Sequence, residues 1–384
     1  MFRHAVAIST LALAGAGLLL GVPGAVAQEP VQTPEYGFLV SGYGSATYNS
    51  RFDDDAFASD FQAAVSPIVL YSVGSDLLFE AELEFELEGE GTQTTLEYAQ
   101  ANYLGFDRFV LTAGKFLLPF GVFSERLHPT WINKLPTPPL LYGHAHGGVA
   151  EGSLTPILSD VGLMVRFSQP LDDLLSFDLS AFVTQGPAEA EHDEGGDGGD
   201  GHTHAIVQAS VTSANQVQFE IPGLAFGTNF SDNNDNKMLG ARLGMVRGAD
   251  FEVYIAGFHA MYNAGDYLDL IGTNLSLEWR RGTFEFRGEG AILWQEFEQN
   301  DEFPTARSPA YYLQVSRRFG DFEPIVRWSH LLETKVDGEV ARDDLQQVAL
   351  GLDYWIQPSV PVKLAFNVDP DGPERLILQW AYGF

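Results

Sequence analysis

From residue 36 onward, apolar and polar residues alternate along most of the chain. A period of two is the pattern of a β-strand with one apolar and one polar face. Aromatic and β-branched residues are frequent in these stretches, which favours strands over helices. The pattern predicts sixteen strands, near residues 36–49, 60–72, 75–88, 93–104, 108–116, 159–168, 174–186, 237–247, 251–263, 267–280, 283–298, 309–319, 321–333, 345–356, 360–368 and 374–384.

The connections between the predicted strands alternate in length. After even-numbered strands they are short, as at Val73-Gly74, Gly248-Ala249 and Arg281-Gly282, and after odd-numbered strands they are longer and polar. Short turns at one end and long loops at the other are typical of bacterial outer-membrane barrels, which favour even strand numbers. The chain is therefore predicted to be all-β, a transmembrane antiparallel β-barrel of about 16 strands.

The two faces of the third predicted strand indicate which side of the wall is wet. One face is apolar from Phe79 to Leu87. The other face carries five carboxylates: Glu80, Glu82, Glu84, Glu86 and Glu88. Such a row needs water, so we expect a water-filled interior with lipid outside, the reverse of a soluble barrel with a packed core. A soluble β-sandwich is the alternative that shares the alternation, but it does not explain the asymmetric loops.

The first residues have the features of an export signal. Arg3 and His4 give a basic start, residues 5–20 form an apolar run, and Ala25-Val26-Ala27 is a small-x-small cleavage pattern. We expect residues 1–27 to be a cleaved signal peptide and residues 28–384 to form the barrel. A membrane anchor is the alternative, but the apolar run is shorter than a comfortable membrane-spanning helix.

The last predicted strand carries an aromatic or aliphatic residue at every second position and finishes at Phe384. This resembles the C-terminal assembly signal of outer-membrane barrels, so we expect Phe384 to be presented to the barrel-assembly machinery. Pairing of the last strand with the first would close the barrel and leave no open edge in lipid.

The chain is strongly acidic, with 52 Asp and Glu against 21 Lys and Arg and a formal net charge of −31. This argues against nucleic acid as a partner, because a phosphate backbone needs basic patches, and it also argues against a lumen selective for anions. The absence of Cys excludes disulfides, thiol chemistry and a lipidated cysteine. An enzyme is not expected, because the sequence has no Gly-x-Ser-x-Gly elbow and no aligned Ser/His/Asp set, although His259 lies in the ninth predicted strand.

A family resemblance rests on the stretch GKFLLPFG, Gly114 to Gly121, which follows a predicted strand and precedes a long loop. Together with LEYAQANY at residues 96–103, it resembles the phosphate-selective porin O/P superfamily of outer-membrane proteins. The motif-level similarity covers about residues 93–142, and the strand number agrees across the chain. The resemblance implies that the third loop, residues 116–158, folds into the barrel lumen and narrows it.

One departure from that superfamily changes the expected solute. Phosphate selectivity there rests on a lumen rich in lysine and arginine, and this chain has few lysines. We therefore carry over the fold and the loop but not the phosphate substrate. The candidate pore-lining residues combine acid and base, as in a transverse field across a constriction. They are Glu80, Glu82, Glu84, Glu86, Arg166, Arg242, Arg287, Arg327 and Lys134. Within the loop, Lys134 is expected to line the eyelet, whereas Glu125 and Arg126 are expected to fix the loop to the wall.

The fourth predicted loop, residues 187–236, contains the tract EAEHDEGGDGGDGHTHA. Imidazole and carboxylate mixtures suit Zn²⁺ and similar ions, and the glycines would let a site form on binding. The candidate metal ligands are His192, Asp193, Asp197, His202 and His204, with His144 and His146 of the third loop. The alternative is a solvated, acidic, glycine-rich loop whose histidines are incidental.

Together these features predict a porin in the outer membrane of a Gram-negative bacterium. We expect a passive diffusion channel for small hydrophilic solutes or ions, embedded in the lipid bilayer and working without a cofactor. A homotrimer is expected by analogy with other porins. Two alternatives stay open: a divalent-metal uptake porin with a Zn²⁺-capturing loop, and an outer-membrane barrel hydrolase.

Overall fold

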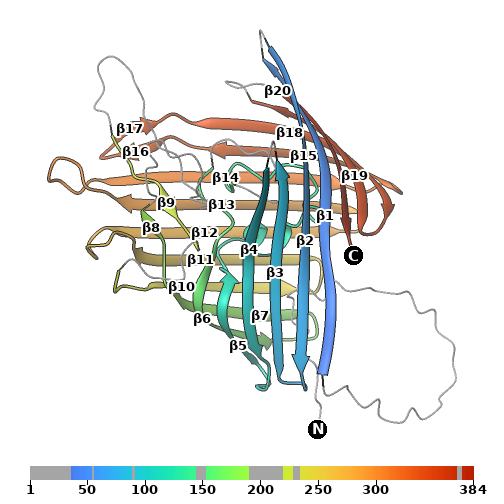
Figure 1. The fold of residues 1–384 in the computed structure, drawn as a ribbon, viewed down its shortest axis with the longest axis horizontal. Coiled ribbons are helices and arrows are strands. Elements are labelled where there is room, and N and C mark those ends of the chain that lie inside the picture. Colours follow the sequence, from blue (N-terminus) through green and yellow to red (C-terminus); the bar gives the residue numbers. More distant parts are fainter. Residues whose placement is uncertain are drawn as a thin grey trace.

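The structure is a computed structural model that describes residues 36–53, 56–88, 91–143, 153–189, 219–227, 234–369 and 374–384. Sixteen strands form the wall of a barrel (Figure 1). They are β1 (Tyr36–Asp53), β2 (Ala56–Val73), β3 (Leu77–Glu88), β4 (Gly91–Tyr103), β5 (Phe109–Leu117), β6 (Ser159–Pro170), β7 (Leu175–Thr184), β10 (Met238–Arg247), β11 (Phe251–Met261), β12 (Asp269–Arg281), β13 (Phe284–Glu296), β14 (Thr305–Arg317), β15 (Phe322–Leu331), β18 (Leu345–Gln357), β19 (Val360–Val368) and β20 (Glu374–Gly383).

Each wall strand pairs antiparallel with its neighbours, and β1 pairs with β20, so the sheet closes on itself. At the seam, the amide of Phe384 donates to the carbonyl of Gly42 at 2.9 Å, and the amide of Gly42 donates to the carbonyl of Phe384 at 3.1 Å. Closure satisfies the backbone groups that an open edge would leave without partners in lipid. The predicted sixteen-stranded barrel is confirmed.

Short turns join the even-numbered strands of the wall to the next strand, as predicted. Several of these turns place a glycine in the left-handed region, for example Gly282 at φ 62° between β12 and β13 and Gly74 at φ 61° between β2 and β3. Residues with a Cβ rarely adopt this conformation, so glycine makes the tight reversal possible. No helix among the described residues is long and apolar enough to cross a membrane.

The alternation along each strand separates two environments. Apolar residues on the outward face are exposed, as with Ile255 on β11 at 58% and Leu275 on β12 at 56%. On β3, Phe79 and Leu83 are exposed, whereas Glu82 on the opposite face is buried. Exposed apolar side chains outside and polar side chains inside are the pattern of a membrane-spanning barrel, which rules out the soluble sandwich.

Three smaller elements lie outside the wall. The hairpin of β16 (Thr334–Val336) and β17 (Glu339–Arg342) extends the sheet beside β14. The pair β8 (Ala188–Glu189) and β9 (Leu224–Ala225) brackets the base of the fourth loop. A single π-helical turn, Phe123–Leu127, lies in the segment between β5 and β6. The predicted signal peptide, residues 1–27, lies outside the described residues.

Candidate functional site

The segment after β5, residues 118–158, lies between β5 and β6, and the structure describes its residues 118–143 and 153–158. It contacts side chains that point inward from the barrel wall. The amide of Phe123 donates to one carboxylate oxygen of Glu289 on β13 at 2.7 Å. The hydroxyl of Tyr142 donates to the other oxygen at 2.7 Å, and the hydroxyl of Tyr312 on β14 donates to the first at 3.0 Å. Glu289 therefore binds two separate parts of the segment, and its three donors offset the cost of burying its carboxylate.

A glycine allows the chain to turn against that carboxylate. Gly121 has φ 92°, and a Cβ built on it would lie 1.9 Å from the hydroxyl oxygen of Tyr142. The residue is thus required both for its backbone conformation and for the space that it leaves. Pro119, two residues before Gly121, restricts the backbone just ahead of the turn, because its ring fixes φ.

Two cationic side chains of the wall bind backbone carbonyls in residues 130–138 of the segment. Arg327 on β15 is fully buried and donates to the carbonyl of Thr137 at 2.8 Å, to its hydroxyl at 2.9 Å and to the carbonyl of Pro138 at 2.8 Å. The ammonium of Lys363 on β19 donates to the carbonyls of Thr130 and Asn133. A non-repetitive backbone leaves its carbonyls without ladder partners, and these two side chains supply them.

Ion pairs fix the same segment along its length. Glu125 pairs with Arg242 on β10 and with Arg166 on β6, at 3.6 Å for the latter. Arg126 pairs with Glu252 on β11 at 2.6 Å. Lys134 pairs with two inward carboxylates, Glu285 on β13 at 3.2 Å and Glu323 on β15.

The electrostatics of Glu125 follow from its surroundings. Burial alone would raise the pKa of its carboxyl group, but the positive charges of Arg242, Arg166 and Arg126 outweigh burial and lower that pKa below its ordinary value. Glu125 is therefore ionised at neutral pH, and its ion pairs with the wall are fully formed.

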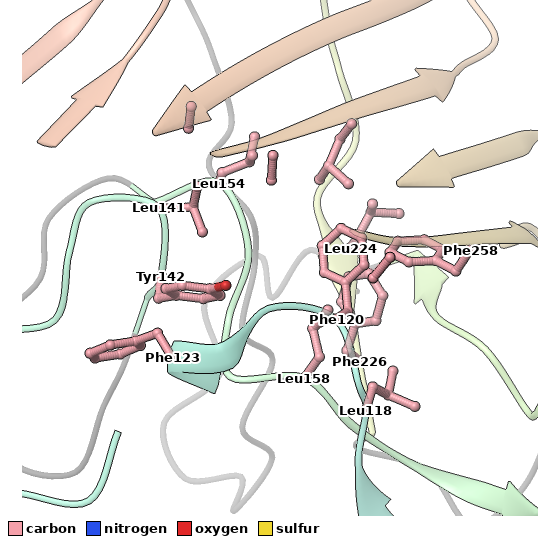
Figure 2. Packing of buried hydrophobic residues seen from close by; sticks show 14 of the residues in the cluster. Leu118, Phe120, Phe123, Leu141, Tyr142, Leu154, Leu158, Leu224, Phe226 and Phe258 are labelled. Carbon is pink, nitrogen blue, oxygen red and sulfur yellow. The ribbon is translucent and has the colours of Figure 1, made fainter. Parts of the chain in front are cut away.

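An apolar cluster joins this segment to the base of the fourth loop. Figure 2 shows the cluster, in which Phe123 stacks beside Tyr142 with ring centroids 5.2 Å apart. Phe120 meets Phe258 of β11 edge-on at 4.9 Å, and Phe226, next to β9, lies 6.5 Å from the same ring. Because these side chains are nearly inaccessible to water, the segment and the fourth-loop base pack as one body against β11.

The inward glutamates of β3 lie among neutral donors of β4, the next strand, and of β1, two strands away. Tyr43 on β1 donates its hydroxyl to Glu82 at 2.5 Å. Gln100 and Asn102 on β4 donate to the same oxygen of Glu80 at 2.6 and 2.8 Å. Glu84 is also buried on the inward face. This part of the wall thus presents carboxylates held in fixed positions by phenol and amide groups.

The structure places the predicted pore-lining residues in two groups on the inner wall. The glutamates belong to β3, and four of the five basic residues contact the segment after β5 or belong to it: Arg166, Arg242, Arg327 and Lys134. The fifth, Arg287, pairs with Glu285. The expected anchoring contacts of Glu125 and Arg126 are present. Lys134, expected at the eyelet, has the same kind of anchoring contact, and a pore-lining role for all nine residues stays a prediction.

Two residues of this site, Glu289 and Lys363, are not among the predicted pore-lining residues, although the alternation along their strands assigns both to the inward face. Both contact the segment after β5. That segment has no repeating pattern, so its partners could not be assigned from the sequence.

The predicted metal ligands cannot be placed. His144, His146, His192, Asp193, Asp197, His202 and His204 all lie outside the described residues. Within the described ranges, no group of three or more His, Cys, Asp or Glu side chains could hold a metal ion.

No protein-family model matches the sequence, and no curated protein matches it. Solved structures are similar in fold. The anion-selective porin from Comamonas acidovorans has a TM-score of 0.54 at 12% identity, over 91% of this chain and 100% of that one. OmpT of Vibrio cholerae, in a trimer form, gives 0.54 at 12% identity over 90% and 99%. The outer membrane channel DcaP of Acinetobacter baumannii gives 0.53 at 10% over 91% and 97%. At such identities the likeness establishes the barrel fold alone.

Proposed function

We propose that this protein is a porin in the outer membrane of a Gram-negative bacterium, a passive channel through which small hydrophilic solutes or ions diffuse. The observation that carries the proposal is the reversal of polarity across the wall: ionisable side chains such as Glu80, Arg242 and Arg287 point inward, while large apolar side chains are exposed outside. Such a wall needs lipid on one side and water on the other. Channels among the structures of similar fold support the same function.

We further propose that the segment after β5 is the constriction. Its contacts with β10, β11, β13, β15 and β19 hold it to one side of the lumen. Solutes would then pass between it and the wall that carries Glu80, Glu82, Glu84 and Glu86. Because Arg126, Lys134, Arg166 and Arg242 pair with carboxylates of the wall or of this segment, their field at the passage is partly cancelled, which favours cations over anions.

The similarity of residues 114–121 to the phosphate-selective porin O/P superfamily supports a distant relationship to it, and we do not extend the relationship to the solute. A homotrimer is proposed because OmpT of Vibrio cholerae occurs in a trimer form. Presentation of Phe384 to the assembly machinery is likewise a proposal. It is supported by the pairing of Phe384 with Gly42 at the seam, the last contact that closes the barrel.

The two alternatives are tested separately. Capture of divalent metal rests on residues outside the described part of the chain, so binding of Zn²⁺ to a peptide of residues 187–236 tests it directly. For a barrel hydrolase, the histidine of interest was His259. It points outward from β11 and contacts Asp269 at 2.8 Å, away from the lumen where a polar substrate would bind.

The experiment for the main proposal is single-channel conductance of refolded protein in a planar bilayer, with a salt gradient that gives the reversal potential. Stable openings with a reversal potential of the sign for cation preference are expected. Absence of conductance from a barrel with intact heat-modifiable electrophoretic mobility would refute the channel, and a reversal potential of opposite sign would refute the proposed solute class alone.

A further inference from the structure

Three outward arginines lie at the end of the barrel that carries the short turns. Arg247, Arg281 and Arg317 are the last residues of β10, β12 and β14, and all three are exposed. In each strand the preceding outward position holds an exposed apolar residue: Met245, Trp279 or Val315, respectively. Outward residues two positions apart are about 6.8 Å apart along a strand. Each guanidinium therefore lies just beyond the edge of the apolar belt.

The strand register places two of these arginines in one row. Phe284 on β13 is the ladder partner of both Arg281 and Arg317. With neighbouring strands about 4.8 Å apart, the Cα atoms of the two arginines are separated by about 10 Å. Aromatic rings complete the surface: Trp279 meets Phe284 edge-on at 5.7 Å, and the guanidinium of Arg317 lies 4.8 Å from the ring centroid of Phe319.

These guanidinium groups differ from those inside the barrel. Among the residues that the structure describes, Arg247, Arg281 and Arg317 form no salt bridge, whereas Arg166, Arg242 and other inward arginines pair with carboxylates. The pKa of the carboxyl group of the turn residue Asp172 is lowered chiefly by hydrogen bonds from the amides of Leu174 and Leu175, and Arg247 contributes less. A planar guanidinium with free donors suits a phosphate group, which it can bind through two parallel hydrogen bonds.

The neighbouring turns carry exposed apolar side chains, which indicates that this edge lies within a membrane interface rather than in bulk water. Phe319 and Phe322 flank the turn between β14 and β15, and Leu171 and Leu174 lie in the turn between β6 and β7, all of them exposed. Aromatic rings and arginines at the edge of an apolar belt occupy the depth of lipid headgroups.

We propose that the surface formed by Arg281, Phe284 and Arg317, extended by Arg247, binds the phosphate of an anionic phospholipid in the leaflet that faces the short turns. The acyl chains would lie along the exposed apolar residues of the same strands, such as Leu275 on β12 and Leu313 on β14. The proposal rests on the membrane-spanning barrel and not on conduction. A protein partner or a soluble anion would not need the apolar strip that continues directly from the arginines.

The experiment measures lipid retained by the refolded full chain. Protein in mixed micelles that contain equal amounts of phosphatidylglycerol and phosphatidylcholine is washed, and the bound lipids are quantified by mass spectrometry. Each arginine near an anionic lipid headgroup is worth about fivefold in preference, so the wild-type protein should retain phosphatidylglycerol at least about fivefold over phosphatidylcholine. The combined variant Arg247→Gln, Arg281→Gln and Arg317→Gln should lose the preference.

The matched control is Arg307→Gln, which removes an exposed outward arginine from the other end of β14. Like each substitution in the combined variant it removes one positive charge, but the control protein should keep the preference for phosphatidylglycerol. Three results would each overturn the proposal. They are a ratio of phosphatidylglycerol to phosphatidylcholine near one for the wild type, an unchanged ratio for the combined variant, and a loss of the preference in the control as complete as in the combined variant. Heat-modifiable mobility shows that every variant has folded, and conductance of the same preparations separates this outcome from failure of the channel.

Discussion

The segment after β5 should detach from the wall when Arg327 is replaced by Met. The guanidinium donates three hydrogen bonds, at 2.8, 2.9 and 2.8 Å, to Thr137 and Pro138. Hydrogen bonds from a charged donor contribute about 1.5–3 kcal/mol each, but they are not additive, and water in the lumen would hydrate the released carbonyls. We therefore expect about 2–4 kcal/mol less docking free energy, which multiplies the undocked fraction by about 30- to 1,000-fold.

The assay is single-channel recording combined with limited proteolysis of the folded barrel. The Arg327→Met channel should have a larger mean conductance and more frequent fluctuations, and protease should cleave near Thr137, where the wild-type protein is protected. Arg307→Met, which removes an exposed arginine on the outer surface, should change neither. Wild-type conductance together with wild-type protease resistance in a correctly folded Arg327→Met barrel would refute the reasoning, because it would show that these hydrogen bonds do not hold the loop.

Three further predictions follow from the same contacts. Gly121→Ala should lower the free energy of unfolding by about 1–3 kcal/mol, measured by urea titration, because an L-residue is strained at φ 92° and its Cβ would collide with the Tyr142 hydroxyl. Glu125, whose pKa is lowered, stabilises the docked segment fully above its ordinary pKa of 4.5, and this stabilisation is lost as the pH falls through the lower pKa of the folded state. Current fluctuations of the wild-type channel should therefore increase only in acid, whereas the Glu125→Gln channel should fluctuate already at pH 7. Identical current traces of the wild type in acid and at pH 7, and of the variant, would contradict this. Glu82→Gln should reduce the ratio of cation to anion permeability about twofold in reversal-potential measurements, and an unchanged ratio would place the passage elsewhere.

The strands could be predicted because a wall between lipid and water forces a two-residue period on every strand. β19 begins and ends where the alternation does, at Val360 and Val368. β1 continues to Asp53, four residues beyond the predicted end, because its last residues pair with the start of β2. The hairpin of β16 and β17 was not predicted. It is short, and its partner is the extension of β14 from Thr305, ahead of the predicted start at residue 309.

The candidate site could be predicted only in part, for a physical reason. The alternation assigns Arg327, Lys363 and Glu289 to the inward face, since each follows the parity of its strand. Their partners are backbone groups of a segment without regular structure, such as the carbonyls of Thr130 and Thr137. Carbonyl groups are the same in every residue, so no side-chain pattern in that segment identifies which of them a distant cation will bind.

The contacts also show how a chain with a net charge of −31 accommodates several inward cations, and they bear on the cation preference proposed above. Arg327 and Lys363 donate to backbone carbonyls, and Arg126 and Lys134 pair with carboxylates of the wall. These four cations hold the loop on the side of β11 to β19. A lumen that binds phosphate needs cations that face the passage. Here the basic side chains position the segment after β5 instead. Under the proposed function, the field that a solute experiences would then come from the carboxylates of β3, which the neutral donors of β1 and β4 hold in place.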